Sequence, residues 1–475
     1  MNTVQKIAKN LVALSIAQLA NLALGFVLSI YIARSLGDIN FGKYSFALAF
    51  TSLFAVFSDM GYNTLLVREV AKDKSQASDY LDNVLSFRLL LSGLIFSFMI
   101  LSINLLSYPT DTKNTIYLFG ACALIDSLAT IFIMIFRAFE RMELEAKIAI
   151  IANIAKTSGG LLVLYLGYGL LGLALVFLLS SSLHFIMLTT ICKKNFANPK
   201  LKFNLQFLKR TLIIALPLSM TGISLLIFTR TDTLMLSSMK GDAVVGWYNA
   251  AYNLVLSFKP IPHLFMNALF PAMAGYAISS KNTFKVISEI SSRYLICLGL
   301  PLAVGISLLA DKIVLFLYGP LYSDSIIALR ILSFDIVIFF IWINCAFILI
   351  SINKQNLWAI TAIATVFLNI ILNILLIPTL SYIGASIATI ISEAICVTFL
   401  IFYIYKELSI FISYYNALFK PMLATSVMAS FICSFNQLNL FIIIIVSMII
   451  YFLSLYIIGG VSKEDISLIH RIIKK

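Results

Sequence analysis

The sequence predicts an all-α integral membrane protein of about fourteen transmembrane helices, built as two six-helix lobes followed by two additional helices. Of its 475 residues, 61% are hydrophobic and only 12% are charged, whereas soluble domains carry about 25% charged residues. Apolar runs long enough to cross a hydrocarbon core of about 30 Å recur along the whole chain. Backbone polar groups inside a bilayer must be satisfied within each run, so we expect these runs to be helices.

Short polar loops separate the apolar runs and leave no room for a soluble catalytic domain. The predicted spans begin near residues 9, 43, 84, 115, 147, 170, 211, 245, 294, 325, 357, 383, 417 and 440. Each span ends where charged or turn-forming residues interrupt the apolar pattern.

One short phrase occurs twice, in equivalent places of the hydropathy pattern. It follows the first predicted span and again the seventh, with the spacing Gly-Asp-x-x-x-Gly-x-Tyr. The two copies are Gly37-Asp38-Ile39-Asn40-Phe41-Gly42-Lys43-Tyr44 and Gly241-Asp242-Ala243-Val244-Val245-Gly246-Trp247-Tyr248. Chance could produce such a match, but its placement in both halves favours duplication. Duplicated membrane units are typical of transporters that handle substrate between the halves.

The repeat predicts an N-terminal six-helix lobe over residues 1–205, a C-terminal six-helix lobe over 206–410, and two additional helices with a cytoplasmic tail over 411–475. Six is an even number, so both lobes should enter the membrane in the same direction, related by a pseudo-twofold axis along its normal. Pro260 and Pro262 lie inside predicted span eight, where they remove backbone donors and kink the helix. This span is either a hinge or a static kink.

The net charge of +13 follows the expected membrane topology. With a cytoplasmic N-terminus, most Lys and Arg residues fall in or beside cytoplasmic segments. The positive residues of the outer loops are Arg34, Lys43, Lys113 and Lys240. This is the positive-inside pattern, so we expect both termini in the cytoplasm and no nucleic-acid partner. The expected location is the cytoplasmic (inner) membrane. The basic stretch 193–210 is either an interfacial amphipathic segment or a topogenic charge cluster.

Ionisable residues inside predicted spans are costly in lipid and mark cavities or internal pairs. Those near the middle of a span are Asp126, Lys156, His184, Lys259, Asp335 and Glu393, and those nearer a span end are Arg34, Asp59, Arg230, Asp232 and Arg330.

Lys156 stands out because its helix carries a polar stripe. Asn153, Lys156, Thr157 and Gly160 share one helical face by their spacing. Such a face could contact a polar ligand, and phosphate oxygens would suit the compact ammonium charge. The alternative is an internal ion pair between Lys156 and Asp126.

Two sets of membrane residues are therefore candidates for function. The substrate-binding candidates, which would form a cationic surface, are Arg34, Lys156, Arg230, Lys259 and Asn153. The candidates for a coupling H⁺ or Na⁺ are Asp126, Asp232, Asp335 and Glu393. The alternative is that acidic residues of the second set pin several cations of the first as structural pairs.

Motifs for catalysis and metal binding are missing from the sequence. The three histidines are scattered, the six cysteines occur singly in apolar stretches, and there is no Gly-rich phosphate loop. We expect no enzymatic activity, no metal and no cofactor beyond a coupling ion.

Several phrases in both predicted lobes match a known pattern. They are Ala33-Arg34-Ser35-Leu36-Gly37 with Phe41-Gly42-Lys43-Tyr44, Asp59-Met60-Gly61-Tyr62 with Arg68-Glu69-Val70-Ala71, Thr231-Asp232-Thr233-Leu234-Met235-Leu236, and Leu368-Asn369 through Pro378 with Gly384-Ala385-Ser386-Ile387-Ala388. Together they resemble the Wzx-type polysaccharide (O-antigen) flippases of the multidrug/oligosaccharidyl-lipid/polysaccharide superfamily. The resemblance covers about residues 1–410 and contains no single diagnostic motif.

The resemblance implies two MATE-like lobes around a central cavity, with alternating access. It implies that the protein moves a polyprenyl-(pyro)phosphate-linked oligosaccharide from the cytoplasmic to the outer leaflet. Arg34 stands at the family's first-loop arginine position, whereas Lys156 has no assigned counterpart. Relatives often carry proline after the first-loop glycine, where this chain has Asp38. The expected protein is a monomer among membrane lipids, with polysaccharide polymerase or glycosyltransferase machinery as candidate partners.

Three other functions fit the hydropathy pattern. A peptidoglycan-precursor (lipid II) flippase would be chemically close. A MATE-like drug or cation antiporter would share the fold, but its cavity should be dominated by acidic residues. A membrane glycosyltransferase or glycan polymerase should show a large outer loop or an acidic metal-binding motif, and the sequence has neither.

Overall fold

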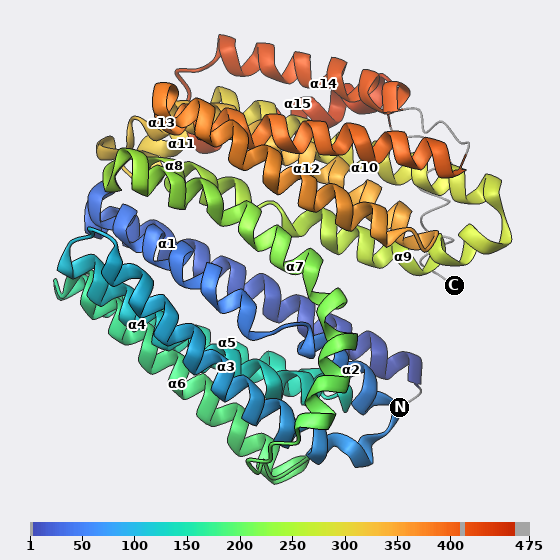
Figure 1. Ribbon diagram of the computed structural model, residues 1–475. Helices are drawn as coiled ribbons and strands as arrows, with labels where there is room; N and C mark the ends of the chain where they lie inside the picture. The colour runs from blue at the N-terminus through green and yellow to red at the C-terminus, as the bar shows by residue number, and fades with distance from the viewer. Residues whose placement is uncertain (1–2, 409–413, 461–475) are drawn as a thin grey trace. The chain divides into compact units, whose positions relative to one another are not determined.

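The computed structural model describes residues 3–408 and 414–460, and these residues are almost entirely helical (Figure 1). The α-helices are α1 (Thr3–Ala55), α2 (Tyr62–Lys72), α3 (Ala77–Leu105), α4 (Thr110–Ala138), α5 (Met142–Tyr165), α6 (Gly169–Asn195), α7 (Leu205–Lys240), α8 (Asp242–Leu256), α9 (Pro260–Ser279), α10 (Lys281–Leu308), α11 (Ala310–Leu317), α12 (Ser325–Ser351), α13 (Gln355–Leu408), α14 (Tyr414–Ser434) and α15 (Leu440–Ile457). Three 3₁₀ turns join them: η1 (Val56–Ser58), η2 (Lys74–Gln76) and η3 (Pro320–Tyr322). Strands are absent from the described part of the chain.

Thirteen of the fourteen predicted spans each correspond to a helix or a helix segment, and the eighth corresponds to α8 together with the start of α9. Two long helices contain two spans each: α1 is interrupted at Gly37, with φ 73° and ψ 173°, and α13 at Ser381, with φ 54°. Ten helical stretches in the described residues are long and apolar enough to cross a membrane. The prediction of an all-α multi-pass membrane protein is thus confirmed.

The chain forms two compact units. The first comprises Met1–Ser237 with Gly241–Gly246, and the second comprises Ser238–Lys240 with Trp247–Lys475. Most of α7 therefore packs with the first unit. The lobe boundary at residues 205/206 was inferred from the repeat alone and stays a prediction.

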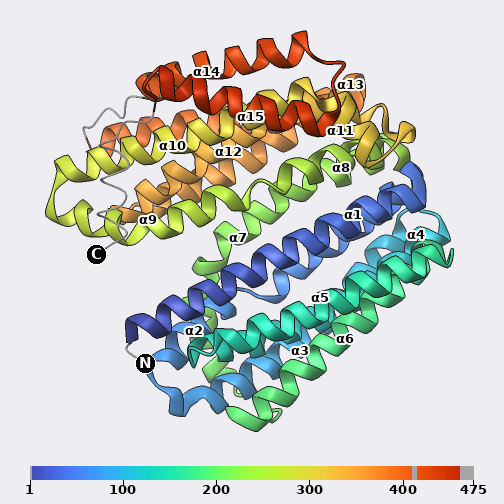
Figure 2. The same cartoon turned by 180° about the vertical axis from the view of Figure 1, so that it is seen from behind.

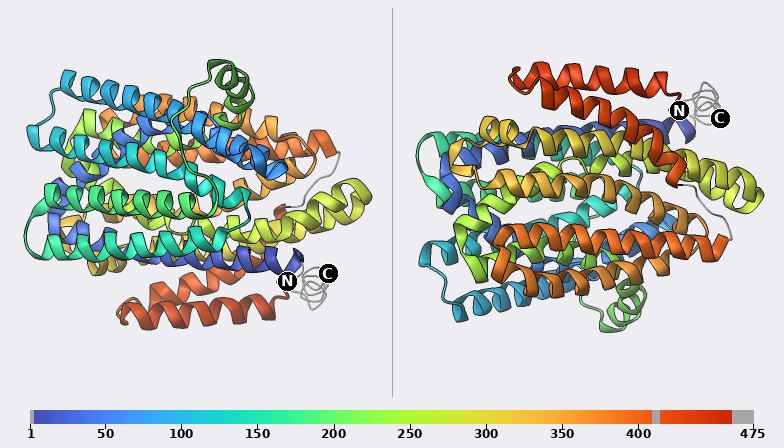
Figure 3. Two further views of the ribbon diagram at one scale, coloured as in Figure 1. Left: turned by 90° about the horizontal axis from the view of Figure 1, so that it is seen from below. Right: turned by 90° about the horizontal axis from the view of Figure 1, so that it is seen from above.

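In the first unit the long helices α3, α4, α5 and α6 lie side by side, as seen in Figures 1 and 3. Their shared core is made of large apolar side chains such as Phe132, Phe136 and Leu81, all buried. The start of α7 is held against this core, because the hydroxyl of Tyr62 in α2 donates to the carbonyl oxygen of Leu208 at 3.1 Å.

Side chains of α3 also anchor the linker that precedes α7. The buried carboxylate of Asp82 accepts the backbone N–H of Lys200 at 2.7 Å, and the amide oxygen of Asn83 accepts that of Asn204 at 2.8 Å. These contacts satisfy backbone donors that a linker without secondary structure would otherwise leave unpaired. Part of the basic stretch 193–210 is therefore fixed to α3, while Leu201 and Phe203 stay exposed.

Helix α12 is central in the second unit, where it packs against α9, α10 and α13. The C-terminal helices α14 and α15 run beside each other, as Figure 2 shows from behind. They attach to α10 through an apolar cluster that includes Met428 and Ile443. The hydroxyl of Tyr451 adds a buried hydrogen bond to the carbonyl oxygen of Cys297, at 2.7 Å.

The two copies of the repeated phrase have the same local structure. Gly37 and Gly241 both have a positive φ, 73° and 88°, which favours glycine because a Cβ is strained there. In each copy the chain resumes a helix at the aspartate that follows, Asp38 or Asp242. Both Gly-Asp steps thus act as the joint between consecutive spans.

Candidate functional site: a polar cavity in the first unit

A cavity of about 390 Å³ lies among α1, α3, α4, α5, α6 and α7 of the first unit. Its ionisable lining residues are Asp59, Arg88, Asp126, Lys156 and Arg230, and its neutral polar ones are Thr51, Ser52, Ser58, Asn63, Ser127, Thr130 and Ser181. Such a concentration of polar groups inside a bundle of membrane helices marks a site for a polar ligand, because lipid would not solvate it.

Lys156 reaches this cavity from the middle of α5. Its ammonium lies 4.0 Å from the centre of the Phe177 ring on α6, a cation–π contact. Within the part of the chain that the structure describes, Lys156 makes no ion pair. Asp126, the partner that the sequence suggested, hydrogen-bonds Ser181 and acts on Lys156 electrostatically from beyond ion-pair distance. The Lys156 ammonium thus lines the cavity without a direct ion pair.

The other members of the predicted stripe have structural contacts. The Asn153 side chain donates to the carbonyl oxygen of Ala149 in its own helix, at 3.0 Å. Thr157 is buried, and Gly160 packs against Leu28 of α1. Of the four stripe residues, Lys156 is the one that lines the cavity.

Of the remaining cationic candidates, Arg230 lines this cavity and Arg34 and Lys259 do not. Arg230 of α7 lines the same cavity as Lys156, and it lies close enough to act electrostatically on Tyr44. Arg34 is exposed on α1 and is not among the lining residues. Lys259 belongs to the second unit. Asp232, on α7, is buried.

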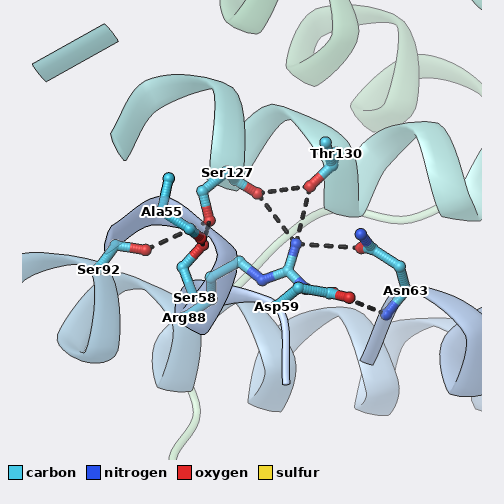
Figure 4. Close-up of polar contacts among 8 residues, drawn as sticks. All are labelled: Ala55, Ser58, Asp59, Asn63, Arg88, Ser92, Ser127 and Thr130. Atoms are coloured by element: carbon cyan, nitrogen blue, oxygen red, sulfur yellow. Dashed lines mark hydrogen bonds and ion pairs between the residues drawn. The ribbon is translucent and has the colours of Figure 1, made fainter. Parts of the chain in front are cut away.

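Arg88 of α3 is a lining residue that sequence reasoning missed (Figure 4). Its side chain is 1% exposed and its guanidinium lies 2.5 Å from a carboxylate oxygen of Asp59. It also donates to the Asn63 side chain at 3.1 Å, to the Ser127 carbonyl at 3.0 Å and to the Thr130 hydroxyl at 2.8 Å. These bonds compensate the cost of burying the charge. The available signal in the sequence is a single arginine between Phe87 and Leu89, near the start of the third predicted span.

The Asp59 partner stands where the chain breaks between η1 and α2. Met60 and Gly61 have φ values of 45° and 84°, so both are in the left-handed region. A Cβ on Gly61 would lie 2.0 Å from the backbone oxygen of Ala215 in α7. The break therefore needs glycine both for its conformation and for the close approach of α7. It carries Asp59 to the edge of the cavity.

The second unit contains a separate ionic cluster. Lys259 precedes α9, and its ammonium lies 2.9 Å from Asp335 of α12 and 3.3 Å from Glu393 of α13. Predicted span eight is broken at this point, with Pro260 and Pro262 in the first turn of α9. Proline is tolerated there because first-turn donors have no intrahelical acceptor. Hinge motion at this break stays a prediction.

Metal and thiol chemistry have no evident site in the described residues. No three His, Cys, Asp or Glu side chains gather there as metal ligands. The cysteines in this part of the chain are unbridged, and five of them are buried in helix packing.

A family comparison places these features in context. The family model described as "Polysaccharide biosynthesis protein" matches residues 7–277, more than half of the chain. The chain belongs to this family. The resemblance inferred from the phrases along the sequence is confirmed at this level.

Two curated relatives match over most of their length. The probable low-salt glycan biosynthesis flippase Agl15 of Haloferax volcanii is 23% identical over 82% of this chain and 81% of the relative. The capsular polysaccharide biosynthesis protein CapF of Staphylococcus aureus is 23% identical over 84% of this chain and 99% of the relative.

Solved transporter structures share the fold. The inward closed conformation of the lipid II flippase MurJ aligns with a TM-score of 0.76 at 19% identity, covering 95% of this chain and 99% of that one. An inward-facing multidrug resistance MATE family transporter of the MOP superfamily aligns with a TM-score of 0.66 at 16% identity, covering 84% of this chain and 98% of that one. The MATE-like fold class predicted from the sequence is therefore confirmed.

Proposed function

We propose that this protein is a flippase that moves a polyprenyl-(pyro)phosphate-linked oligosaccharide from the cytoplasmic to the outer leaflet, for surface polysaccharide or glycan export. The observation that carries the proposal is the polar cavity of the first unit, with Lys156 and Arg230 among its lining residues. An anionic phosphate with a sugar head cannot cross hydrocarbon unaided, so its carrier must offer a polar, cationic route.

The cavity chemistry fits such a head group. Lys156 would act as a point charge for phosphate oxygens, while the serine and threonine hydroxyls around it can exchange hydrogen bonds with sugar hydroxyls. Phe177 and Phe119 also line the cavity and offer apolar faces against which a sugar ring can pack. Relatives named as a glycan biosynthesis flippase and a capsular polysaccharide biosynthesis protein support this assignment.

Transport without catalysis is part of the proposal. The charged side chains that line the cavity would bind the head group rather than cleave a bond in it. The lipid tail would stay in the bilayer while the head group passes through the protein. Coupling to an H⁺ or Na⁺ gradient would supply the driving force.

Deletion of the gene in the native host, followed by a leaflet-specific assay of lipid-linked oligosaccharides, tests the proposal. We expect the oligosaccharides to accumulate in the cytoplasmic leaflet, with unchanged resistance to organic cations. Re-expression of the wild-type protein should reverse the accumulation. Normal glycan export with new sensitivity to organic cations would replace the proposal with a drug exporter. Accumulation of the peptidoglycan precursor alone would replace it with a lipid II flippase.

A further inference from the structure

The ionic cluster of the second unit holds three charged groups in a nearly closed environment. The side chains of Lys259, Asp335 and Glu393 are 12%, 0% and 7% exposed. They come from three different elements, the α8–α9 break, α12 and α13. One ammonium lies within 3.3 Å of an oxygen from each carboxyl group, and the Glu393 carboxyl group also interacts directly with that of Asp335.

The charges of this cluster do not balance. One lysine faces two carboxyl groups, so full ionisation would leave one negative charge in the interior of a membrane protein. A buried charge without a partner is strongly unfavourable there, and a protein relieves it by binding a proton or a cation.

Among the residues that the structure describes, the groups around the cluster supply no second positive charge. Phe339 presents its ring 4.3 Å from the Lys259 ammonium, and the Tyr252 ring of α8 lies at 5.9 Å. His263 of α9 packs beside Phe339, with ring centroids 5.8 Å apart. A positive charge on His263 would be repelled by Lys259, which acts on it electrostatically. From α13, Cys396 follows Glu393 by about one helical turn.

Both carboxyl groups also have an oxygen atom with no partner. Oδ1 of Asp335 and Oε2 of Glu393 are buried and form no hydrogen bond within the described residues. An ionised carboxylate would leave these acceptors unsatisfied in a low-dielectric environment. A protonated carboxyl group gains a donor instead, which can serve the carboxylate beside it.

We propose that Lys259, Asp335 and Glu393 form a binding site for one exchangeable proton, and that the Lys259 ammonium excludes Na⁺ by occupying the place of a metal cation. The proton is held on one carboxyl group of the pair and shared with the other. It arrives from water and returns to water, and no covalent bond other than O–H changes. The cluster is neutral with the proton bound and carries one negative charge without it.

The position of Lys259 links this charge change to the backbone. Its backbone ends the break between α8 and α9, where the N–H groups of Phe258 and Lys259 bond carbonyls three residues back. Pro260 then begins α9. Loss of the proton would strengthen the pull of two carboxylates on Lys259 and favour the entry of water at this break. The site can thus couple proton binding to a change at the joint of span eight.

Sodium binding provides the first test, on the purified full-length protein in detergent without cargo. We expect NaCl and choline chloride, at equal ionic strength, to give the wild type the same thermal unfolding temperature. Lys259→Ala leaves two carboxylates without their cation, and NaCl should then stabilise the variant over choline chloride. The matched control is Lys285→Ala, which removes a lysine of α10 that is paired with Glu289 at 3.9 Å outside the cluster, and it should show no difference between the salts. Stabilisation of the wild type by Na⁺ would overturn the proposal.

Infrared spectroscopy provides the second test and remains informative if Lys259→Ala does not fold. The wild type should show a protonated-carboxyl band that Asp335→Asn or Glu393→Gln removes and that disappears reversibly at high pH. A wild-type spectrum in which neither substitution changes this band would overturn the proposal. Both tests work without an oligosaccharide, so their result is independent of the flippase assignment for the first unit.

Discussion

Gly42 and Asp242 approach each other so closely that a Cβ on Gly42 would lie 1.8 Å from the backbone oxygen of Asp242. The reverse relationship also holds, since a Cβ on Gly246 would lie 2.2 Å from the backbone oxygen of Asp38. Each copy of the repeated phrase thus places its second glycine against the aspartate of the other copy. This reciprocal packing explains why both copies combine a Gly-Asp joint with a glycine four residues after the aspartate.

Gly42→Ala should therefore push the two phrases apart. We expect a loss of about 1–3 kcal/mol in the free energy of unfolding, because the methyl group would meet backbone atoms that cannot rotate away. Thermal unfolding of the purified protein measures the effect. Gly25→Ala in the same helix is the control, since nothing lies within 4 Å of its added Cβ. Equal stability of the two variants would argue against a tight contact at Gly42.

Lys156→Met should reduce flipping of the lipid-linked oligosaccharide. Loss of one charge-assisted contact, about 1.5–3 kcal/mol, corresponds to a transport decrease of about tenfold to a hundredfold. The leaflet assay in the deletion strain measures it. Lys147→Met removes an exposed lysine from the same helix and should leave transport unchanged. Full transport by the Lys156 variant, at wild-type protein levels, would remove this residue from the binding site.

Arg88→Met should destabilise the first unit by about 3 kcal/mol, because it leaves Asp59 and its neighbours without their central donor. The double variant Arg88→Met/Asp59→Asn should recover part of this loss, since no unpaired carboxylate remains. Chemical or thermal unfolding of the wild type, Arg88→Met, Asp59→Asn and the double variant gives the coupling energy between the two residues. Strictly additive effects would mean that the 2.5 Å pair contributes no specific interaction.

Asp82→Ala should weaken the attachment of the linker before α7. The substitution removes the acceptor of the Lys200 N–H, and a backbone donor left unsatisfied costs about 1–3 kcal/mol. Asp79→Ala is the control: its carboxylate is 68% exposed and reaches only the Lys202 ammonium, at 3.4 Å. Protease cleavage between residues 195 and 205 should accelerate in the Asp82 variant alone. Similar cleavage of both variants would contradict this role.

The contact of Lys202 with Asp79 and Asp82 should depend on pH. Hydrogen bonds with Asp79 and Asp82 raise the pKa of Lys202 above its usual value. When the pKa is higher in the folded state, the contact contributes its full stabilisation at a pH below the unfolded-state pKa. This stabilisation is lost as the pH rises through the folded-state pKa. Any protection that the Lys202 contact gives the linker should therefore be constant around neutral pH and fade only in strongly basic buffer. Cleavage rates of wild type and Lys202→Met, compared across pH, measure this; a fading near neutral pH would contradict it.

Hydropathy was sufficient to predict the long apolar helices, because the cost of an unpaired backbone in lipid makes each long apolar run helical. It did not predict the short helices α2 and α11. The pairing of charges was harder to predict. Lys259, just before α9, contacts Asp335 and Glu393 because α9, α12 and α13, which are distant in sequence, are each rotated about their axes so that these side chains face one another. For the same reason the Asn153 stripe predicted a polar wall, whereas packing turned Gly160 toward Leu28 and left Lys156 at the cavity.

Arg88 shows a second limit of sequence reasoning. A positive charge near the predicted cytoplasmic end of a span satisfies the topology rule wherever its side chain points. Only the break at Met60 and Gly61 brings Asp59 into reach of the guanidinium. That break was visible in the sequence as Asp59-Met60-Gly61, but its partner on α3 depended on the packing of the bundle.

The reciprocal contacts of Gly42 with Asp242 and of Gly246 with Asp38 also have a meaning for the origin of the chain. Matching residues that exchange the same contact are the mark of an isologous interface, in which two identical subunits face each other across a twofold axis. A half-length ancestor with one Gly-Asp phrase could have made this contact with a second copy of itself. After fusion of two such genes, each copy of the phrase would have constrained substitutions at the matching glycine of the other.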